Sequence, residues 1–123
     1  MKYHCLKYRL MITHSKNNLK QDAHGHVFEI ELFLETPNAQ FFEFSEMEQC
    51  MERAMAPYQQ KYLNDFPVFG GNTSLENVGE VIWKELVASY EGTPWEPERL
   101  EISETPLRVY AISTNRFERR YGK

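Results

Sequence analysis

Cysteine is scarce in this sequence, and long hydrophobic runs are absent from it. The two cysteines, Cys5 and Cys50, predict reduced thiols in the interior, because a chain of 123 residues can build a core without disulfide cross-links. A membrane-spanning helix needs roughly 20 consecutive apolar residues, which no segment here provides. The N-terminus also shows no signal-peptide pattern, so we expect a cytoplasmic protein with no membrane partner.

The sequence also lacks an excess of basic residues. It has 14 lysines and arginines against 18 aspartates and glutamates, which gives a net charge of -4 at pH 7. Nucleic-acid binding normally requires a concentrated basic face, so we expect no nucleic-acid partner. Only residues 116–123 form a short basic cluster, which we interpret as a solvated terminus or the edge of an interface.

Apolar residues, by contrast, are plentiful enough for one packed core. Hydrophobic residues make up 41% of the chain and aromatic residues 14%. A second core would need a longer chain, and no internal repeat or low-complexity segment divides this one. We therefore expect residues 1–123 to form a single domain.

Two segments near the start of the chain alternate between apolar and polar side chains, which is the period of a half-buried strand. In residues 3–14, one parity holds His4, Leu6, Tyr8, Leu10, Ile12 and His14. In residues 24–35, one parity holds His24, His26, Phe28, Ile30, Leu32 and Leu34. We predict that the two strands pair as a hairpin and that residues 15–23 form an exposed loop between them.

Two helices are predicted in the middle of the chain. The first begins at Ser45, where Glu48 three residues later completes a capping box, and it ends near Pro57. The second follows a glycine-rich loop and is capped by Thr73 or Ser74, with Glu76 placed for another capping box. Strand patterns return at residues 100–104 and 109–112, so the predicted order is strand, strand, helix, helix, strand, strand.

Three histidines form a candidate zinc site. His24 and His26 are two residues apart in a strand and therefore project from the same face, while His14 lies on the buried face of the neighbouring strand. A hairpin that places His14 opposite the start of the second strand would supply three nitrogen ligands and leave a fourth zinc position for water or substrate. Core histidines that hydrogen-bond to the backbone are the alternative. His4 lies about ten residues from His14, too far to join the set.

Glu104 is a candidate binding residue, because it shares its parity with Leu100 and Ile102. That parity predicts a carboxylate directed toward the core, where it needs hydrogen-bond donors. A glutamate that faces solvent from an edge strand is the alternative.

These segments together resemble the 6-pyruvoyl-tetrahydropterin synthase and 6-carboxytetrahydropterin synthase family from about Tyr8 to Ile112. The resemblance is carried by His14, His24-Gly25-His26, Tyr62-Leu63-Asn64-Asp65, Asn72-Thr73-Ser74-Leu75-Glu76-Asn77 and Ser103-Glu104-Thr105-Pro106. It implies an α+β tunnelling fold, in which a four-stranded antiparallel sheet carries two helices on one face. It also implies that subunits oligomerise into a barrel as a homohexamer, a trimer of dimers. Zinc on the three histidines and a glutamate anchoring the amino-pyrimidine edge of a pterin are implied as well. Glu104 fits the anchoring role, and Ser74 is the second expected substrate-binding residue.

The sequence departs from the family at the catalytic positions. The family has a cysteine four residues before the His-Gly-His motif, where this chain has Lys20, and an Asp-His pair where this chain has Gln59 and Gln60. Glutamine cannot exchange a proton near neutral pH, so the usual relay is missing. Lys20, or less favourably Asp22, is a candidate replacement base, although Lys20 fits a solvated loop residue equally well.

Three functions remain open at this point. The first is a zinc-dependent lyase of pterin or queuosine biosynthesis, acting on 7,8-dihydroneopterin triphosphate or a related pterin with non-standard catalytic residues. The second is a catalytically inactive module that binds a pterin or purine and retains the metal site. The third is a structural domain without a metal.

Overall fold

The computed structural model describes residues 3–36 and 42–121. Its helices and strands follow the predicted order, with two additions. The elements are β1 (Tyr3–His14), β2 (His24–Glu35), α1 (Phe44–Met55), β3 (Lys61–Tyr62), α2 (Leu75–Ser89), β4 (Glu96–Thr105), β5 (Arg108–Ser113) and α3 (Asn115–Tyr121). Short 3-10 turns connect them at Lys20–Asp22, Ala56–Tyr58, Leu63–Asp65 and Pro67–Phe69. None of the helices within these described ranges is long and apolar enough to span a membrane.

The strands form one sheet in the order β3-β1-β2-β4-β5. The four long strands are antiparallel to their neighbours, as predicted. The two-residue β3 pairs in parallel with β1, and we did not predict it because two residues show no alternation. Its pairing depends on a tertiary contact: Gln60, at φ 59°, donates its backbone N–H to the carbonyl of Met11 at 2.7 Å.

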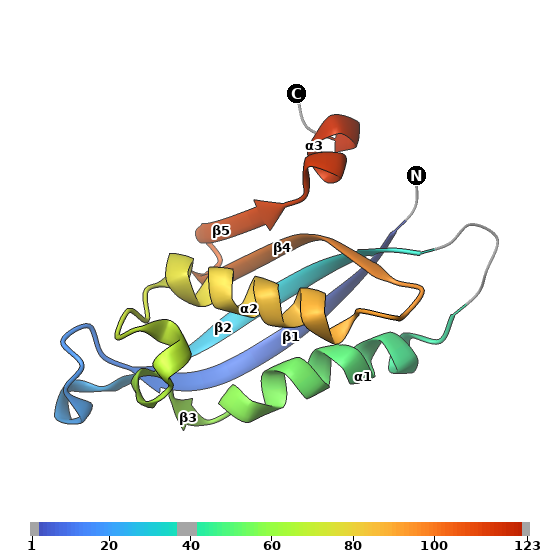
Figure 1. The fold of residues 1–123 in the computed structure, drawn as a ribbon. Coiled ribbons are helices and arrows are strands. Elements are labelled where there is room, and N and C mark those ends of the chain that lie inside the picture. Colours follow the sequence, from blue (N-terminus) through green and yellow to red (C-terminus); the bar gives the residue numbers. More distant parts are fainter. Residues whose placement is uncertain (1–2, 37–41, 122–123) are drawn as a thin grey trace.

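Both long helices lie on the same face of the sheet, side by side (Figure 1). This face carries the apolar parity of β1 and β2. The predicted alternation is confirmed from Leu6 to His14 and from His26 to Leu34, whereas His24 at the start of β2 is exposed. The largest fully buried side chains come from the strands, both long helices and the turn that begins at Leu63: Leu10, Phe28, Ile30, Leu32, Leu34, Met47, Met51, Met55, Leu63, Ile82, Leu86 and Leu100. Burial of this apolar surface is the main favourable term that holds the helices against the sheet.

The helix caps agree with the sequence at α2 and differ at α1. Ser74 is the N-cap of α2, and its Oγ accepts the backbone N–H of Asn77 at 3.3 Å. The capping box with Glu76 is wrong, because the residue three positions after the cap is Asn77. The cap predicted at Ser45 is also wrong: α1 begins one residue earlier, so the serine lies within the first turn and cannot occupy the capping position.

Residues 115–121 form α3, a helix that the sequence pattern did not predict. Thr114 prepares its start by accepting the backbone N–H of Phe117 on Oγ1 at 3.0 Å. Arg116 then pairs with Glu96 at 3.0 Å and with the buried Glu98 at 3.5 Å. This part of the tail is therefore tied to β4 by charge-assisted contacts rather than solvated throughout.

Both cysteines are free thiols, and only one of them lies in the core. Cys50 of α1 is buried, as predicted. Cys5 is half-buried on the face of the sheet opposite the helices, so its assignment to the core was wrong; its parity in β1 places it there. Its Sγ donates to Glu31 Oε1 at 2.9 Å.

Candidate metal centre and binding pocket

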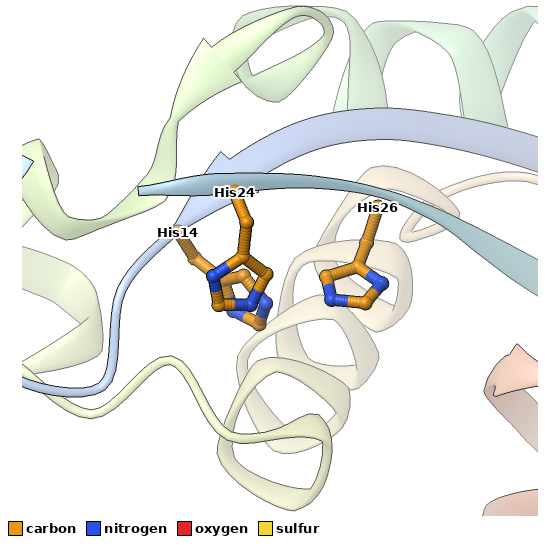
Figure 2. A group of neighbouring side chains, drawn as sticks. All are labelled: His14, His24 and His26. Carbon is orange, nitrogen blue, oxygen red and sulfur yellow. The ribbon is translucent and has the colours of Figure 1, made fainter. Parts of the chain in front are cut away.

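The three predicted histidines lie together at one end of the sheet. In the antiparallel ladder of β1 and β2, His14 pairs directly with His24, and His26 lies two residues further along the same face. The ring centroids of the three imidazoles are 4.8 to 5.0 Å apart, which makes a nearly equilateral triangle. One ring nitrogen from each lies within 4.8 Å of the others. Figure 2 shows His24 and His26 extending from one strand to the same side, with His14 beside them.

His14 is the most deeply buried of the three, with 7% of its surface exposed. Its Nδ1 lies 2.9 Å from the carbonyl oxygen of Thr73. A carbonyl can only accept, so Nδ1 carries the proton and Nε2 presents a lone pair. That Nε2 atom is buried and has no hydrogen-bond partner in the described part of the chain.

The surroundings of His14 favour its neutral form. Burial lowers the pKa of His14, the charges that His24 and His26 can carry lower it further, and the bond to Thr73 opposes the shift. Neutral imidazole is the form that binds a metal, and a ring N–H donated to a backbone carbonyl is the usual second contact of a metal-binding histidine. The orphaned lone pair and the donor set therefore fit a zinc ion.

A pocket of about 660 Å³ opens beside the three histidines. Its other walls are residues 71–76, which lead into the first turn of α2, together with Lys16 and Glu104. Pockets of about 300 to 1,000 Å³ are typical of small-molecule sites. The pocket therefore has room for a small heterocyclic ligand next to the imidazoles.

Glu104 lies in the wall of this pocket, near the end of β4. Its Oε2 is 4.0 Å from Nδ1 of His26, and its side chain is 28% exposed. The structure thus places this carboxylate beside the histidines, on the helix-covered side that its parity indicated. The two carboxylate oxygens of Glu104 can accept hydrogen bonds from two N–H groups of a ligand in the pocket.

Ser74 also lines the pocket, at the point where α2 begins. Its hydroxyl oxygen accepts the N–H of Asn77 as the helix cap, and the backbone N–H groups of the first turn, which have no acceptor within the ladder of the helix, lie near it. Lys16, which sequence reasoning missed, brings a positive charge to the same pocket. The alternation of β1 gave one indication of this position, because Lys16 follows His14 by two residues and so has the same parity.

Lys20 is not among the residues that line the pocket. It lies in the 3-10 turn Lys20–Asp22, where 76% of its side chain is exposed. Its Nζ is 3.9 Å from Asp65 and 5.8 Å from the centre of the Tyr62 ring. The carboxylate of Asp22 also has a partner, because its Oδ2 accepts a hydrogen bond from Nδ2 of Asn17 at 2.6 Å. The structure therefore does not bring either candidate base to the histidines.

Gln59, at one of the family's catalytic positions, is bound to the edge of β1. Its side-chain oxygen accepts the backbone N–H of Met11 at 2.7 Å, and its nitrogen donates to the carbonyl of Arg9 at 3.1 Å. These contacts imitate the hydrogen bonds of a neighbouring strand. The carboxamide thus extends the sheet edge next to β3 instead of facing the pocket.

Fold and site together define an α+β protein that holds three imidazoles at one end of its sheet, beside a pocket of small-molecule size. Residues 3–115 match the family model described as 6-pyruvoyl tetrahydropterin synthase. Because this match spans most of the chain, the protein belongs to the 6-pyruvoyl tetrahydropterin synthase family, and the resemblance seen in the sequence is confirmed. No curated protein matches the chain.

Solved structures share the fold across nearly the whole chain. The 6-pyruvoyl tetrahydropterin synthase of Caenorhabditis elegans is 15% identical with a TM-score of 0.72, covering 94% of this chain and 98% of that chain. An uncharacterized protein from Wolinella succinogenes is 11% identical with a TM-score of 0.67, covering 93% and 98%. A Plasmodium vivax 6-pyruvoyltetrahydropterin synthase whose catalytic glutamate is replaced by cysteine is 14% identical with a TM-score of 0.62, covering 94% and 99%. The predicted tunnelling fold is therefore confirmed.

Proposed function

We propose that this protein is a zinc-dependent, pterin-binding lyase that acts on 7,8-dihydroneopterin triphosphate or a related pterin in the cytoplasm. The observation that carries the proposal is the buried, unpartnered Nε2 of His14, which lies among three imidazoles at the side of a pocket. A buried polar atom without a partner is costly, and a metal ion would remove that cost.

Binding and orientation of the ligand are assigned to residues of this chain. His14, His24 and His26 would hold the zinc ion, and Glu104 would accept two N–H donors from the amino-pyrimidine edge of the pterin. Ser74 and the first turn of α2 would face the polar end of the ligand. When bound, zinc would supply Lewis-acid polarisation of a ligand oxygen, which makes protons on adjacent carbons easier to remove.

The proton acceptor in this proposal is a lysine of the loop between β1 and β2. The resemblance to the family favours Lys20, whereas of these two lysines only Lys16 lines the pocket. A catalytic glutamate occurs in the Plasmodium vivax synthase, which supports the idea that related proteins use different catalytic side chains on one fold. The two lysines are therefore tested against each other.

The alternative is a module that binds a pterin or purine and retains the metal without turnover. It is favoured by Gln59, which occupies a catalytic position of the family and is engaged in hydrogen bonds to the edge of β1. Loss of the proton relay with retention of the binding pocket would leave this function.

The two functions are separated by incubating zinc-loaded protein with dihydroneopterin triphosphate and resolving the products. We expect turnover that falls at least tenfold in Lys16→Ala and remains within about twofold in Lys20→Ala, since general base catalysis contributes on the order of 10²-fold or more. The opposite ranking would assign the role to Lys20. Tight binding without conversion supports the module, and a protein that binds neither zinc nor pterin excludes both functions.

The homohexameric assembly, a trimer of dimers, is part of the proposal. Strand β5 (Arg108–Ser113) pairs on one side with β4 and, in the described part of the chain, has no strand on its other side. Leu107 at the preceding turn is 93% exposed and Val109 is 53% exposed. Sheet edges of this kind are normally covered or paired, which a barrel of several subunits would achieve. Light scattering after size-exclusion chromatography measures the number of subunits.

A further inference from the structure

The side chain of Asn64 connects the loops that surround the histidine site. Its Oδ1 accepts the backbone N–H of Ser15 at 3.0 Å and the hydroxyl of Thr73 at 3.3 Å. Its Nδ2 donates to the carbonyl of Ser15 at 2.8 Å and to Oδ1 of Asn18 at 2.6 Å. A carboxamide has two donor hydrogens and two acceptor lone pairs, so all four of its bonding positions are used.

Two of these contacts act on the position of His14. Ser15, which Asn64 holds through both its backbone N–H and its carbonyl, follows His14 directly in the chain. Thr73, which donates its hydroxyl to Asn64, accepts the Nδ1 proton of His14 on its backbone carbonyl. One side chain therefore fixes both the backbone next to the histidine and the carbonyl that orients its ring.

The platform that carries Asn64 is anchored in the core. Leu63, in the same 3-10 turn, is fully buried, and the neighbouring Tyr62 hydroxyl lies 2.6 Å from Oγ of Ser15. Ser15 is 2% exposed and Thr73 is 5% exposed, so their bonds to the half-buried Asn64 are partly shielded from competing water. Hydrogen bonds in such an environment are electrostatically stronger than in water.

Asn18 closes the arrangement from the loop side. Its backbone has φ 60°, a left-handed conformation that asparagine adopts more readily than most residues. Its side chain packs against Gly71, where an added Cβ would lie 3.3 Å from Asn18 Nδ2. The loop after β1 and the loop before α2 are thereby held together over the Asn64 carboxamide.

We propose that Asn64 is a positioning residue of the zinc site: it presets the His14 ring, with Nε2 directed to the metal, by holding Ser15 and Thr73 at once. This inference rests on the proposed function, because it needs zinc at the three histidines. It adds a residue that contacts neither metal nor ligand but sets the geometry of the most buried donor. Substitution of the outer residues that orient a metal-binding histidine typically changes metal affinity by about 10- to 100-fold.

The test compares zinc affinity in Asn64→Ala, Asn64→Asp and wild-type protein by competition with a chromogenic chelator. We expect the dissociation constant for zinc to rise about 10- to 100-fold in Asn64→Ala. Asn64→Asp retains the acceptor oxygen but loses both donor bonds and places a negative charge against the Ser15 carbonyl, so it should also bind more weakly. Asn17→Ala is the matched control: Asn17 lies in the same loop and bonds Asp22 and Leu19, and its removal should change zinc affinity less than about threefold.

A residue that serves stability alone would behave differently. It would lower the melting temperature of the metal-free variant while leaving zinc affinity of the folded variant at the wild-type value, and that result would overturn the proposal. Equal loss of affinity in Asn17→Ala would overturn it as well. If Asn64→Ala does not fold, Thr73→Val replaces it, because this substitution keeps the backbone carbonyl and removes only the hydroxyl that bonds Asn64. A weaker zinc affinity in Thr73→Val would then support the positioning role of Asn64. If wild-type protein binds no zinc, the proposed function and this inference are both wrong. If wild-type protein binds zinc and the Asn64 variants bind it with the same affinity, the inference alone is wrong.

Discussion

His14 illustrates how burial prepares a side chain for metal binding. Its ring donates one nitrogen proton to Thr73 and leaves the other nitrogen without a partner among the described residues. Desolvation lowers the pKa of His14, because a charged imidazole would lose hydration that the pocket wall does not replace. The same ring exposed to water would be protonated over a wider range of pH and would bind metal less readily.

The lowered pKa of His14 predicts that the metal-free protein loses stability as pH falls. Below the unfolded pKa of about 6.5, the unfolded chain binds a proton that the folded chain resists, so the free energy of unfolding decreases with decreasing pH. Denaturant unfolding in the presence of a chelator, at pH 7.5 and pH 5.0, measures this loss. His14→Asn retains a donor for Thr73 without the titration and should lose less stability over that range. An equal loss in both proteins would contradict the assignment to His14.

Cys5 should react slowly with thiol reagents. Burial and then the hydrogen bond and charge of Glu31 raise the pKa of the Cys5 thiol to about 12, so the reactive thiolate is rare at neutral pH. In a Cys50→Ala background, labelling by a chromogenic disulfide reagent at pH 8 should be slower than for free cysteine. Glu31→Gln should accelerate it, whereas Glu29→Gln, which alters another glutamate of β2, should not. Equal acceleration by both substitutions would contradict the role of Glu31.

At the scale of whole elements, α2 (Leu75–Ser89) connects the core to the pocket. Val78, Ile82 and Leu86 are buried on its sheet-facing side, and its N-terminal turn lines the pocket with residues 74–76. Strand β2 has the same double role, since its apolar parity continues into His24 and His26 at its first residues. The elements that build the core therefore also place the site.

The N-cap of α2 should matter more than the serine at the start of α1. We expect Ser74→Ala to lower the free energy of unfolding by about 1 kcal/mol, because the hydroxyl oxygen accepts the N–H of Asn77. Ser45→Ala should change it by less than about 0.5 kcal/mol, because Ser45 lies inside the first turn and caps nothing. Urea unfolding monitored by circular dichroism compares the two. Similar losses in both variants would mean that α1 begins at Ser45 in solution.

At the scale of the whole molecule, a zinc ion at the three histidines would join the ends of β1 and β2 near the loop before α2. Any ligand that binds only the folded chain stabilises it by mass action, by about 2.7 kcal/mol at a concentration 100 times its dissociation constant. The site would then contribute to the stability of the fold as well as to chemistry.

Zinc should therefore raise the melting temperature, on the order of 10 °C for a chain of this size, and a chelator should reverse the change. His24→Ala should abolish the zinc-dependent part. His4→Ala serves as the control, since His4 lies at the far end of β1 and is packed against Phe44 instead. Differential scanning calorimetry provides the measurement. If zinc does not change the melting temperature of the wild-type protein, the result would favour a domain without a metal.

Local sequence pattern was enough to predict the inward faces of the strands and to put the three histidines on that face. An alternation of two residues per period directs side chains to one face whatever the rest of the chain does, so the parities of His14, His24 and His26 were readable from local pattern. The register that pairs His14 with His24 was a condition of the predicted site, and the folded hairpin meets it. The parity of Glu104 indicated its side of the sheet in the same way.

The other residues that surround the pocket could be identified only in the folded chain. Lys16 and Lys20 lie in one loop and look alike in sequence, yet only Lys16 lines the pocket. Three features join segments that are more than forty residues apart in the chain: the pairing of β3 with β1, the hydrogen bonds of Gln59 to the edge of β1, and the bonds of Asn64 to Ser15 and Asn18. The contact of Asn64 with Thr73 is the exception. Such contacts depend on how the whole chain packs, because hydrogen bonds between distant segments leave no periodic pattern in the sequence.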